Sequence, residues 1–299
     1  MTWSGPRSAH CRLTWLDHGA RDSLPSFCGP TLPSQPMKMP CDFDPIMHMK
    51  GSYVSSFFVA SWPVDVVRGL LPEGVALARQ VVTKDGMHPV FFGFGQQINA
   101  TLTYFEWLPF FPLNYLEFFI GIPAVRRNQH GILPYDEPYM FLARLYLNEV
   151  IPVLGGALFW GFPKELARIK KQEGLYEVET LRTDSPLISL ASTPTGPFIA
   201  AENSQSFSFL GGLLGQRLLQ KSLEGHGPLA SASMKWYLAN AQIRPIEAQM
   251  TISTAFLPGL PTGTFASLGI DQSPTGAFEL RSNWRLSLPF PPGSPSCLG

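Results

Sequence analysis

The sequence predicts a mainly β fold, an antiparallel sheet or barrel that carries a few short helices. Segments of alternating apolar and polar residues recur along the chain, and many turns separate them, since the 299 residues include 29 Pro and 27 Gly. Few segments show helical spacing, and strands do not alternate with helices as they do in a parallel sheet. Charged residues make up only 15% of the chain, which favours an apolar cavity or an apolar assembly surface.

We expect one folded domain, residues 46–290, between two extensions. Residues 1–45 are rich in Pro, Ser, Gly and Cys and lack a sustained periodicity, as is typical of disordered segments. Residues 291–299 are similar and predict a flexible tail. The four cysteines all lie in the two tails of the chain, at Cys11, Cys28, Cys41 and Cys297. The domain core therefore uses neither a disulfide nor a cysteine metal site, and we expect a cytoplasmic protein.

Strands are expected where β-branched and aromatic residues alternate with polar residues between turn signals. These segments are 52–62, 75–83, 88–105, 139–150, 175–182, 186–194, 234–256 and 276–290. Helices are expected from apolar residues at helical spacing, in segments 63–72, 164–172 and 208–225.

Two apolar stretches bear on the site. The run 149–160 carries no charge after Glu149, so we expect it to be buried. Segment 104–125 resembles a membrane span, but three prolines and the carboxylates of Glu106 and Glu117 interrupt it. A helix in lipid would have to bury both carboxylates, so we expect a pocket wall, a lid or a buried oligomer contact instead.

Several classes of site are excluded by charge and motif. Lys plus Arg and Asp plus Glu are equal at 22 each, so no global field points to nucleic acid or an anionic membrane. The sequence has no phosphate-binding loop and no Gly-x-Ser-x-Gly motif, and Gly93-Phe94-Gly95 lacks the third glycine of a dinucleotide fingerprint. The six histidines show no metal-ligand spacing. We therefore expect neither a cofactor nor a metal.

Lys164 is the residue that the chemistry of the sequence singles out. It follows an apolar run and Pro163, which is expected to be the first residue of a helix. The positive potential of a helix N-terminus and burial against the preceding aromatic residues would both lower the pKa of the amine. A neutral lysine can attack a carbonyl group and form an imine. Lys164 is therefore a candidate nucleophile.

Other interpretations of these residues stay open. Glu165, if it points inward, would stabilise the ammonium form of its neighbour. Lys164 could also lie over an apolar edge with its ammonium group in water. Glu117 could be a solvated carboxylate at the end of a strand.

The sequence Phe162-Pro163-Lys164, followed by a charged residue and a predicted helix, resembles the active-site motif of the acetoacetate decarboxylase family. Acetoacetate decarboxylase is a known example of an activated lysine. Weaker similarity extends over about 50–290 and includes 57–77, Tyr115-Leu116-Glu117, Tyr146-Leu147-Asn148 and 238–252.

The resemblance implies a seven-stranded, cone-like antiparallel barrel that assembles into homo-oligomers. It also implies Lys164 as the Schiff-base nucleophile and Glu117 as the pocket carboxylate, with decarboxylation through an imine that accepts electrons. Tyr53, Tyr115, Phe162 and Glu165 are the implied substrate-binding positions, and two of them differ from the family. Glu165 stands where the decarboxylase has a second lysine, and Tyr53 stands where it has an arginine that holds the substrate carboxylate.

Fewer cations therefore remain to bind an anionic keto acid. We expect a decarboxylase-like lyase that acts on a keto acid or a related, more apolar carbonyl compound through a lysine Schiff base. The alternative is a barrel that binds a small or lipid-like molecule and has lost the chemistry. Neither interpretation requires nucleic acid or a membrane span.

Overall fold

The computed structural model describes residues 47–104, 108–109, 112–127, 138–162, 164–182, 185–220 and 230–289. Contacts divide the chain into Met1–Pro40 and Cys41–Gly299, and all described residues belong to the second unit. The predicted extension 1–45, the tail 291–299 and the four cysteines lie outside the described residues.

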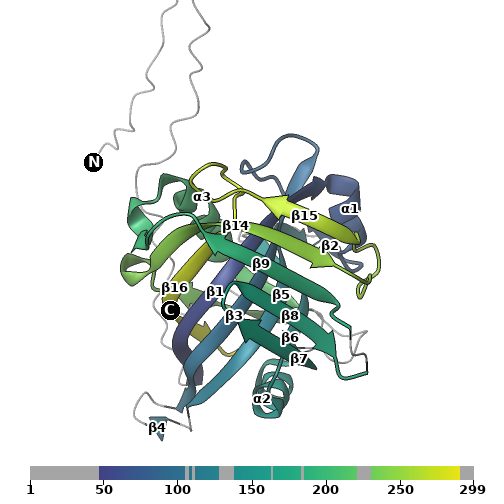
Figure 1. Ribbon diagram of the computed structural model, residues 1–299. Helices are drawn as coiled ribbons and strands as arrows, with labels where there is room; N and C mark the ends of the chain where they lie inside the picture. Colours follow the sequence, from purple (N-terminus) through teal and green to yellow (C-terminus); the bar gives the residue numbers. More distant parts are fainter. Residues whose placement is uncertain are drawn as a thin grey trace, which may run out of the picture. The chain divides into compact units, whose positions relative to one another are not determined.

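The described part of the chain is built mainly from strands, which confirms the predicted class (Figure 1). The strands are β1 (Met47–Pro63), β2 (Val75–Leu77), β3 (Met87–Tyr104), β4 (Leu108–Pro109), β5 (Leu113–Arg127), β6 (Tyr139–Leu147), β7 (Glu165–Gln172), β8 (Leu175–Thr180), β9 (Ile188–Pro194), β10 (Ile199–Ala200), β11 (Arg217–Gln220), β12 (Ala230–Ala232), β13 (Met234–Trp236), β14 (Gln242–Ile252), β15 (Gly263–Ser267) and β16 (Phe278–Ser287). The helices are α1 (Val64–Gly69), α2 (Val150–Trp160) and α3 (Gln205–Leu214), with short 3-10 turns at Ala201–Asn203 and Leu238–Asn240.

The strands form one sheet whose main hydrogen-bonded path closes on itself. The order runs β6-β7-β8-β9-β14-β16-β1-β3-β5, and β5 also pairs with β6. The pairs are antiparallel except β6–β7 and β6–β11, which are parallel among the described strands. The front of Figure 1 shows β9, β8 and β7 side by side, as their pairing requires.

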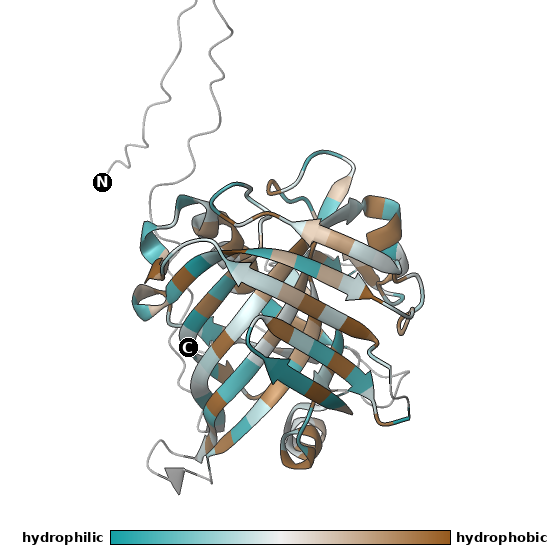
Figure 2. Ribbon diagram, in the orientation of Figure 1, coloured by the Kyte–Doolittle hydropathy of each residue, from teal (hydrophilic) through white to brown (hydrophobic). Residues whose placement is uncertain are grey.

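Each long strand contributes to two apolar cores, because successive side chains point to opposite faces of a sheet. Phe58, Phe92 and Phe118 belong to one core, while Phe57 and Phe91 belong to the other. The second core also receives α3, β11 and the end of β16. The alternation of brown and teal along β14, β9 and β8 in Figure 2 reflects the same period of two.

Three of the predicted elements are wrong in type or extent. Segment 164–172 is a strand and not a helix: Ala167 and Ile169 are buried while Arg168 is exposed, which is the period of a strand. Segment 208–225 is helical only to Leu214, and β11 follows it. The strand expected at 75–83 is limited to β2.

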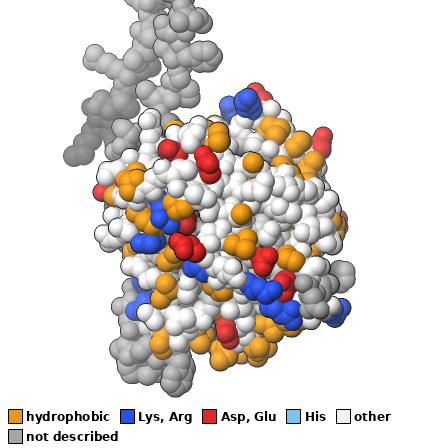
Figure 3. All heavy atoms as spheres, viewed as in Figure 1, with side chains coloured by type: hydrophobic (Ala, Val, Ile, Leu, Met, Phe, Trp, Pro, Cys, Tyr) orange, Lys and Arg blue, Asp and Glu red, His pale blue; other side chains and the backbone are white. Residues whose placement is uncertain are grey.

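The apolar run 149–160 contains helix α2 and is not uniformly buried. Val150, Ile151, Leu154 and Leu158 are 51 to 79% exposed. This helix is brown in Figure 2, and Figure 3 shows hydrophobic side chains gathered at the same lower edge of the visible face. Elsewhere on that face basic and acidic side chains are interspersed. Among the described helices, none is both long and apolar enough to cross a membrane.

Candidate active site

Lys164 lies at the junction between helix α2 and strand β7, and not in the first turn of a helix. The backbone at Gly161 is left-handed (φ 61°), and its N–H donates to the Ala157 carbonyl oxygen (3.0 Å), which ends α2. Strand β7 begins at Glu165, directly after the lysine. The predicted helix start at this position is wrong, so no helix N-terminus acts on the amine.

Gly156 of α2 makes room for the Lys164 side chain. A Cβ atom at position 156 would overlap Cδ and Cε of Lys164 and lie 2.9 Å from its Nζ, closer than real Cβ contacts. The Gly156 carbonyl oxygen also accepts a hydrogen bond from the Phe162 N–H (3.1 Å). One residue of the helix therefore supports both the side chain and the backbone of the segment that carries the amine.

Glu117 reaches the same pocket from the middle of strand β5. Its neighbours in the sheet are Gly95 on β3 and Leu147 on β6, and its side chain is buried with 8% exposure. Gln97 Nε2 donates a hydrogen bond to Glu117 Oε1 (3.0 Å). The carboxyl group is thus fixed on the sheet and faces the pocket that Lys164 also lines.

The segments Tyr115-Leu116-Glu117 and Tyr146-Leu147-Asn148 are joined by two hydrogen bonds. The Leu116 N–H donates to Asn148 Oδ1 (2.7 Å), and the Asn148 N–H donates to the Leu116 carbonyl oxygen (3.1 Å). This pair joins the start of β5 to the end of β6, immediately before α2. The contact fixes the position of the carboxylate strand relative to the helix that supports the lysine.

Burial shifts Lys164 and Glu117 toward their neutral forms. Desolvation lowers the pKa of Lys164, and the nearby Glu117 carboxylate opposes this by a smaller amount. Desolvation raises the pKa of Glu117, while Lys164 and the hydrogen bond from Gln97 oppose it. Lys164 nevertheless keeps some accessible surface and lines the pocket, so a ligand can reach the amine. The pair is suited to nucleophilic attack and to proton donation.

Tyr53 lies beside the pocket, packed over a glycine. The ring occupies the space in which Gly95 would carry a Cβ, and Phe119 does the same over Gly93. These contacts explain the glycine pair on β3, which permits aromatic side chains to lie on the sheet. The Tyr53 side chain is fully buried. Desolvation raises the pKa of the Tyr53 hydroxyl, and the nearby Glu117 carboxylate raises it further. This arrangement offers no cation where the resemblance implies an arginine.

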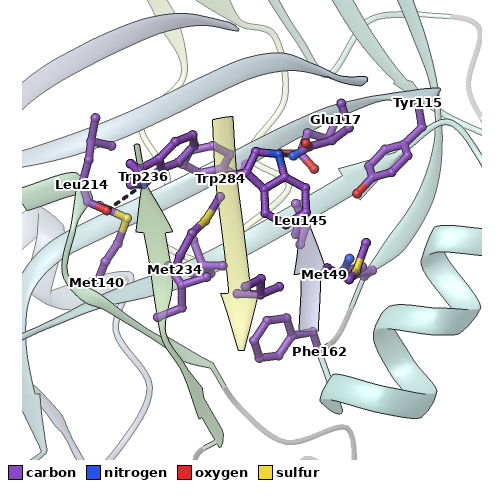
Figure 4. Close-up of a pocket in the computed structure, with 16 residues that line it drawn as sticks. Met49, Tyr115, Glu117, Met140, Leu145, Phe162, Leu214, Met234, Trp236 and Trp284 are labelled. Atoms are coloured by element: carbon purple, nitrogen blue, oxygen red, sulfur yellow. Dashed lines mark hydrogen bonds between the residues drawn. The ribbon is translucent and has the colours of Figure 1, made fainter. Parts of the chain in front are cut away.

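The rest of the pocket is apolar. About 670 Å³ around these side chains is not filled by protein atoms, a volume that includes space open to solvent. Its further lining residues are Met49, Phe119, Met140, Leu142, Leu145, Phe162, Leu214, Leu218, Met234, Trp236, Trp284 and Leu286. Figure 4 shows Glu117 and Tyr115 on one side of this group, with Met140, Leu214 and Trp236 on the other.

The structure brings together four of the six predicted site residues. Lys164, Glu117, Tyr115 and Phe162 line one pocket, and Tyr53 packs next to it. Glu165 lies outside the pocket lining. Its carboxylate pairs with Arg144, which also donates to the Phe256 carbonyl oxygen (3.2 Å).

Three residues of the site have no clear signal in the sequence. Gln97 and Trp284 line the pocket, and Gln97 Oε1 and Trp284 Nε1 are buried without a hydrogen-bond partner among the described residues. Gly156 is the third. Alternation along a predicted strand could have indicated that Gln97 shares a face with its neighbours Gly93 and Gly95, but only the sheet register places it beside Glu117.

Comparison with known proteins identifies the family to which the chain belongs. Residues 30–257 match the model of the acetoacetate decarboxylase (ADC) family. No curated protein matches the chain at a significant level. A crystal structure of acetoacetate decarboxylase from Legionella pneumophila is 14% identical, with 81% of this chain and 86% of that chain covered and a TM-score of 0.54.

Two further solved structures are also similar. An acetoacetate decarboxylase-like enzyme from Sphingomonas wittichii is 14% identical (82% of this chain, 93% of that chain, TM-score 0.48). The enduracididine biosynthesis enzyme MppR with HEPES bound is 12% identical (83% and 88%, TM-score 0.47). Since the family model covers most of the sequence, the chain belongs to the acetoacetate decarboxylase family.

Proposed function

We propose that the protein is a lyase that forms a Schiff base between Lys164 and a carbonyl compound bound in the pocket. The observation that carries this proposal is the desolvated pair of Lys164 and Glu117. Their surroundings lower the pKa of the amine and raise that of the carboxyl group. The neutral amine is then a nucleophile, and the carboxylic acid can supply a proton.

The reaction with a β-keto acid begins when the Lys164 amine adds to the ketone carbon. The carbinolamine oxygen takes a proton from Glu117 and leaves as water, which gives the protonated imine. The bond to the carboxylate then breaks, carbon dioxide leaves, and the electron pair moves toward the imine nitrogen. The enamine takes a proton from solvent on carbon, which gives the protonated imine again. Water hydrolyses this imine to a ketone and the free amine, and the proton released returns to the Glu117 carboxylate.

The charge of the pocket supports a keto acid or a related carbonyl compound that is more apolar than acetoacetate. Among the described lining residues, Lys164 is the one cationic side chain and Glu117 the one acidic side chain. The protonated imine can balance one carboxylate, and a second buried charge would have no partner. Tyr53 adds no positive charge to the site.

A ligand-binding barrel without chemistry is the second candidate, because most of the lining is apolar. Borohydride trapping followed by mass spectrometry separates the two. We expect β-keto acids to leave a reduced adduct on Lys164, and Lys164→Ala to abolish it. Lys84→Ala removes an exposed lysine and is the matched control.

Absence of any adduct on Lys164, while another enzyme of the family is trapped in parallel, would overturn the Schiff base. If the protein is instead a ligand-binding barrel without chemistry, Lys164 is not needed for ligand affinity. Lys164→Ala would then retain ligand affinity within about twofold.

A further inference from the structure

The polar groups of the pocket lie together at one end. Gln97 and Tyr115 are paired across β3 and β5, and Glu117 follows two residues along β5 on the same face. Lys164 joins them from the junction after α2. A ligand that reacts with the amine therefore places its carbonyl group at this end.

The pocket continues from this end along strand β6. Leu147 pairs with Glu117, and the lining residues that follow toward the start of β6 are Leu145, Leu142 and Met140. A bulge at Ala143 brings these residues to one face although their spacing is uneven. At about 3.3 Å per residue, the five-residue distance from Leu145 to Met140 spans roughly 16 Å.

The far end is closed by apolar side chains from the covering elements. Leu218 on β11 pairs with Met140 in the sheet, and Leu214 ends α3 nearby. Trp236 Nε1 donates to the Leu214 carbonyl oxygen (3.1 Å), so this wall presents no unsatisfied indole N–H. Figure 4 shows Met140, Leu214 and Trp236 opposite Glu117 and Tyr115.

The far end is also adaptable. Met140 packs over Gly121, where a Cβ would lie 2.9 Å from its sulfur, and Met234 faces the same pocket. Methionine side chains are unbranched and flexible, and they adjust to the shape of an apolar ligand. No lining residue at this end carries a charge among the described residues.

From this separation of polar and apolar ends we infer the substrate class. The pocket takes a carbonyl compound with all its polar atoms at Lys164 and an unbranched apolar chain, on the order of ten carbons, that runs along β6 to Met140 and Leu218. This inference rests on the proposed function and adds the chain. A 3-oxo acid of medium length, whose decarboxylation leaves a 2-alkanone, has this form.

Binding of 2-alkanones of increasing length tests the chain site without requiring turnover. Trp236 and Trp284 line the pocket, so their fluorescence reports binding. Burial of one methylene group is worth about 0.8 kcal/mol, so Kd should fall about fourfold per added methylene until the pocket is filled. A series that does not depend on chain length would overturn the inference.

Substitutions at the far end of the pocket should change the 2-alkanone chain length beyond which Kd stops falling. Leu218→Trp fills the end and should shorten the preferred ketone, whereas Leu218→Ala should lengthen it. Leu181→Trp, at a 57% exposed position outside the pocket, is the matched control and should leave the series unchanged. If Leu218→Trp does not fold, Leu218→Ala alone decides, and an unchanged series in it contradicts the chain site.

Trapping on Lys164 with acetoacetate and with a ten-carbon 3-oxo acid separates this inference from the proposed function. Binding that depends on chain length without any adduct keeps the chain site and overturns the Schiff base. Equal trapping of both acids together with flat binding keeps the Schiff base and overturns the chain site.

Discussion

The Lys164 side chain crosses helix α2 at Gly156, where a methyl group would occupy the space of its Cδ and Cε atoms. The adjacent Gly155 has no atom within 4 Å of an added Cβ. Two neighbouring glycines of one helix thus differ completely in what they leave room for. Gly156 is required by the lysine, while Gly155 is not required by any described neighbour.

This difference predicts opposite effects of two alanine substitutions. Gly156→Ala should displace the Lys164 side chain and reduce the rate of borohydride-trapped adduct formation at least tenfold. Gly155→Ala should keep that rate and stabilise the protein by about 0.5–1 kcal/mol, since alanine is the better helix former. Trapping rates and denaturant unfolding measure both effects. Equal rates in the two variants would contradict the role of Gly156.

The lowered pKa of Lys164 predicts its pH dependence. Desolvation outweighs the opposing Glu117 carboxylate, so the amine should lose its proton below the ordinary lysine value of about 10.4. The rate of amine labelling should rise as the pH passes through the lowered pKa and then level off. Competitive labelling against a free lysine peptide, read by mass spectrometry, measures the midpoint. A midpoint at or above that of the peptide would show that burial does not govern this amine.

Removal of the Glu117 charge should lower the pKa of Lys164 further. The carboxylate stabilises the ammonium form, so Glu117→Gln should move the labelling midpoint to lower pH. Glu165→Gln is the matched control, because Glu165 pairs with Arg144 outside the pocket. We expect the control to leave the midpoint in place. A shift in Glu165→Gln as large as in Glu117→Gln would mean that the adjacent carboxylate acts on the amine.

The raised pKa of Glu117 should also appear in stability. The folded protein holds this proton at pH values at which the unfolded chain, with an ordinary value of about 4.3, has lost it. The contribution of Glu117 to the free energy of unfolding is therefore full below that value and declines as pH rises through the raised pKa. Urea unfolding of wild type and Glu117→Gln across this range measures it, and the advantage of Gln should grow with pH. A pH-independent difference would contradict the shift.

Much of the β framework could be predicted from local pattern. The strands that contain Phe57, Phe91 and Leu280 alternate apolar and polar residues or combine aromatic runs with turn signals, and each was expected close to its observed position. Lys164 and Glu117 could also be selected as a pair, but only because their motifs resemble a family. Homo-oligomeric assembly and a cytoplasmic location stay predictions.

The local errors have physical reasons. Residues 165–172 fit a helix by the spacing of Leu166 and Ile169, but pairing with β6 and β8 on both sides selects a strand. Helix α2 has apolar residues on all sides, so no periodic pattern indicated it. The contact of Gly156 with Lys164 depends on the angle between this helix and β7. Spacing along the chain does not encode that angle.

Helix α2 turns Leu154 and Leu158 outward, while Gly156 between them lies against the Lys164 side chain. The proposed nucleophile thus packs against a helix whose outer surface exposes apolar side chains. A displacement of this helix would change the space that Gly156 leaves for the Lys164 side chain. The rate at which the Lys164 amine is labelled should therefore respond to the binding of another molecule to the exposed apolar face of α2.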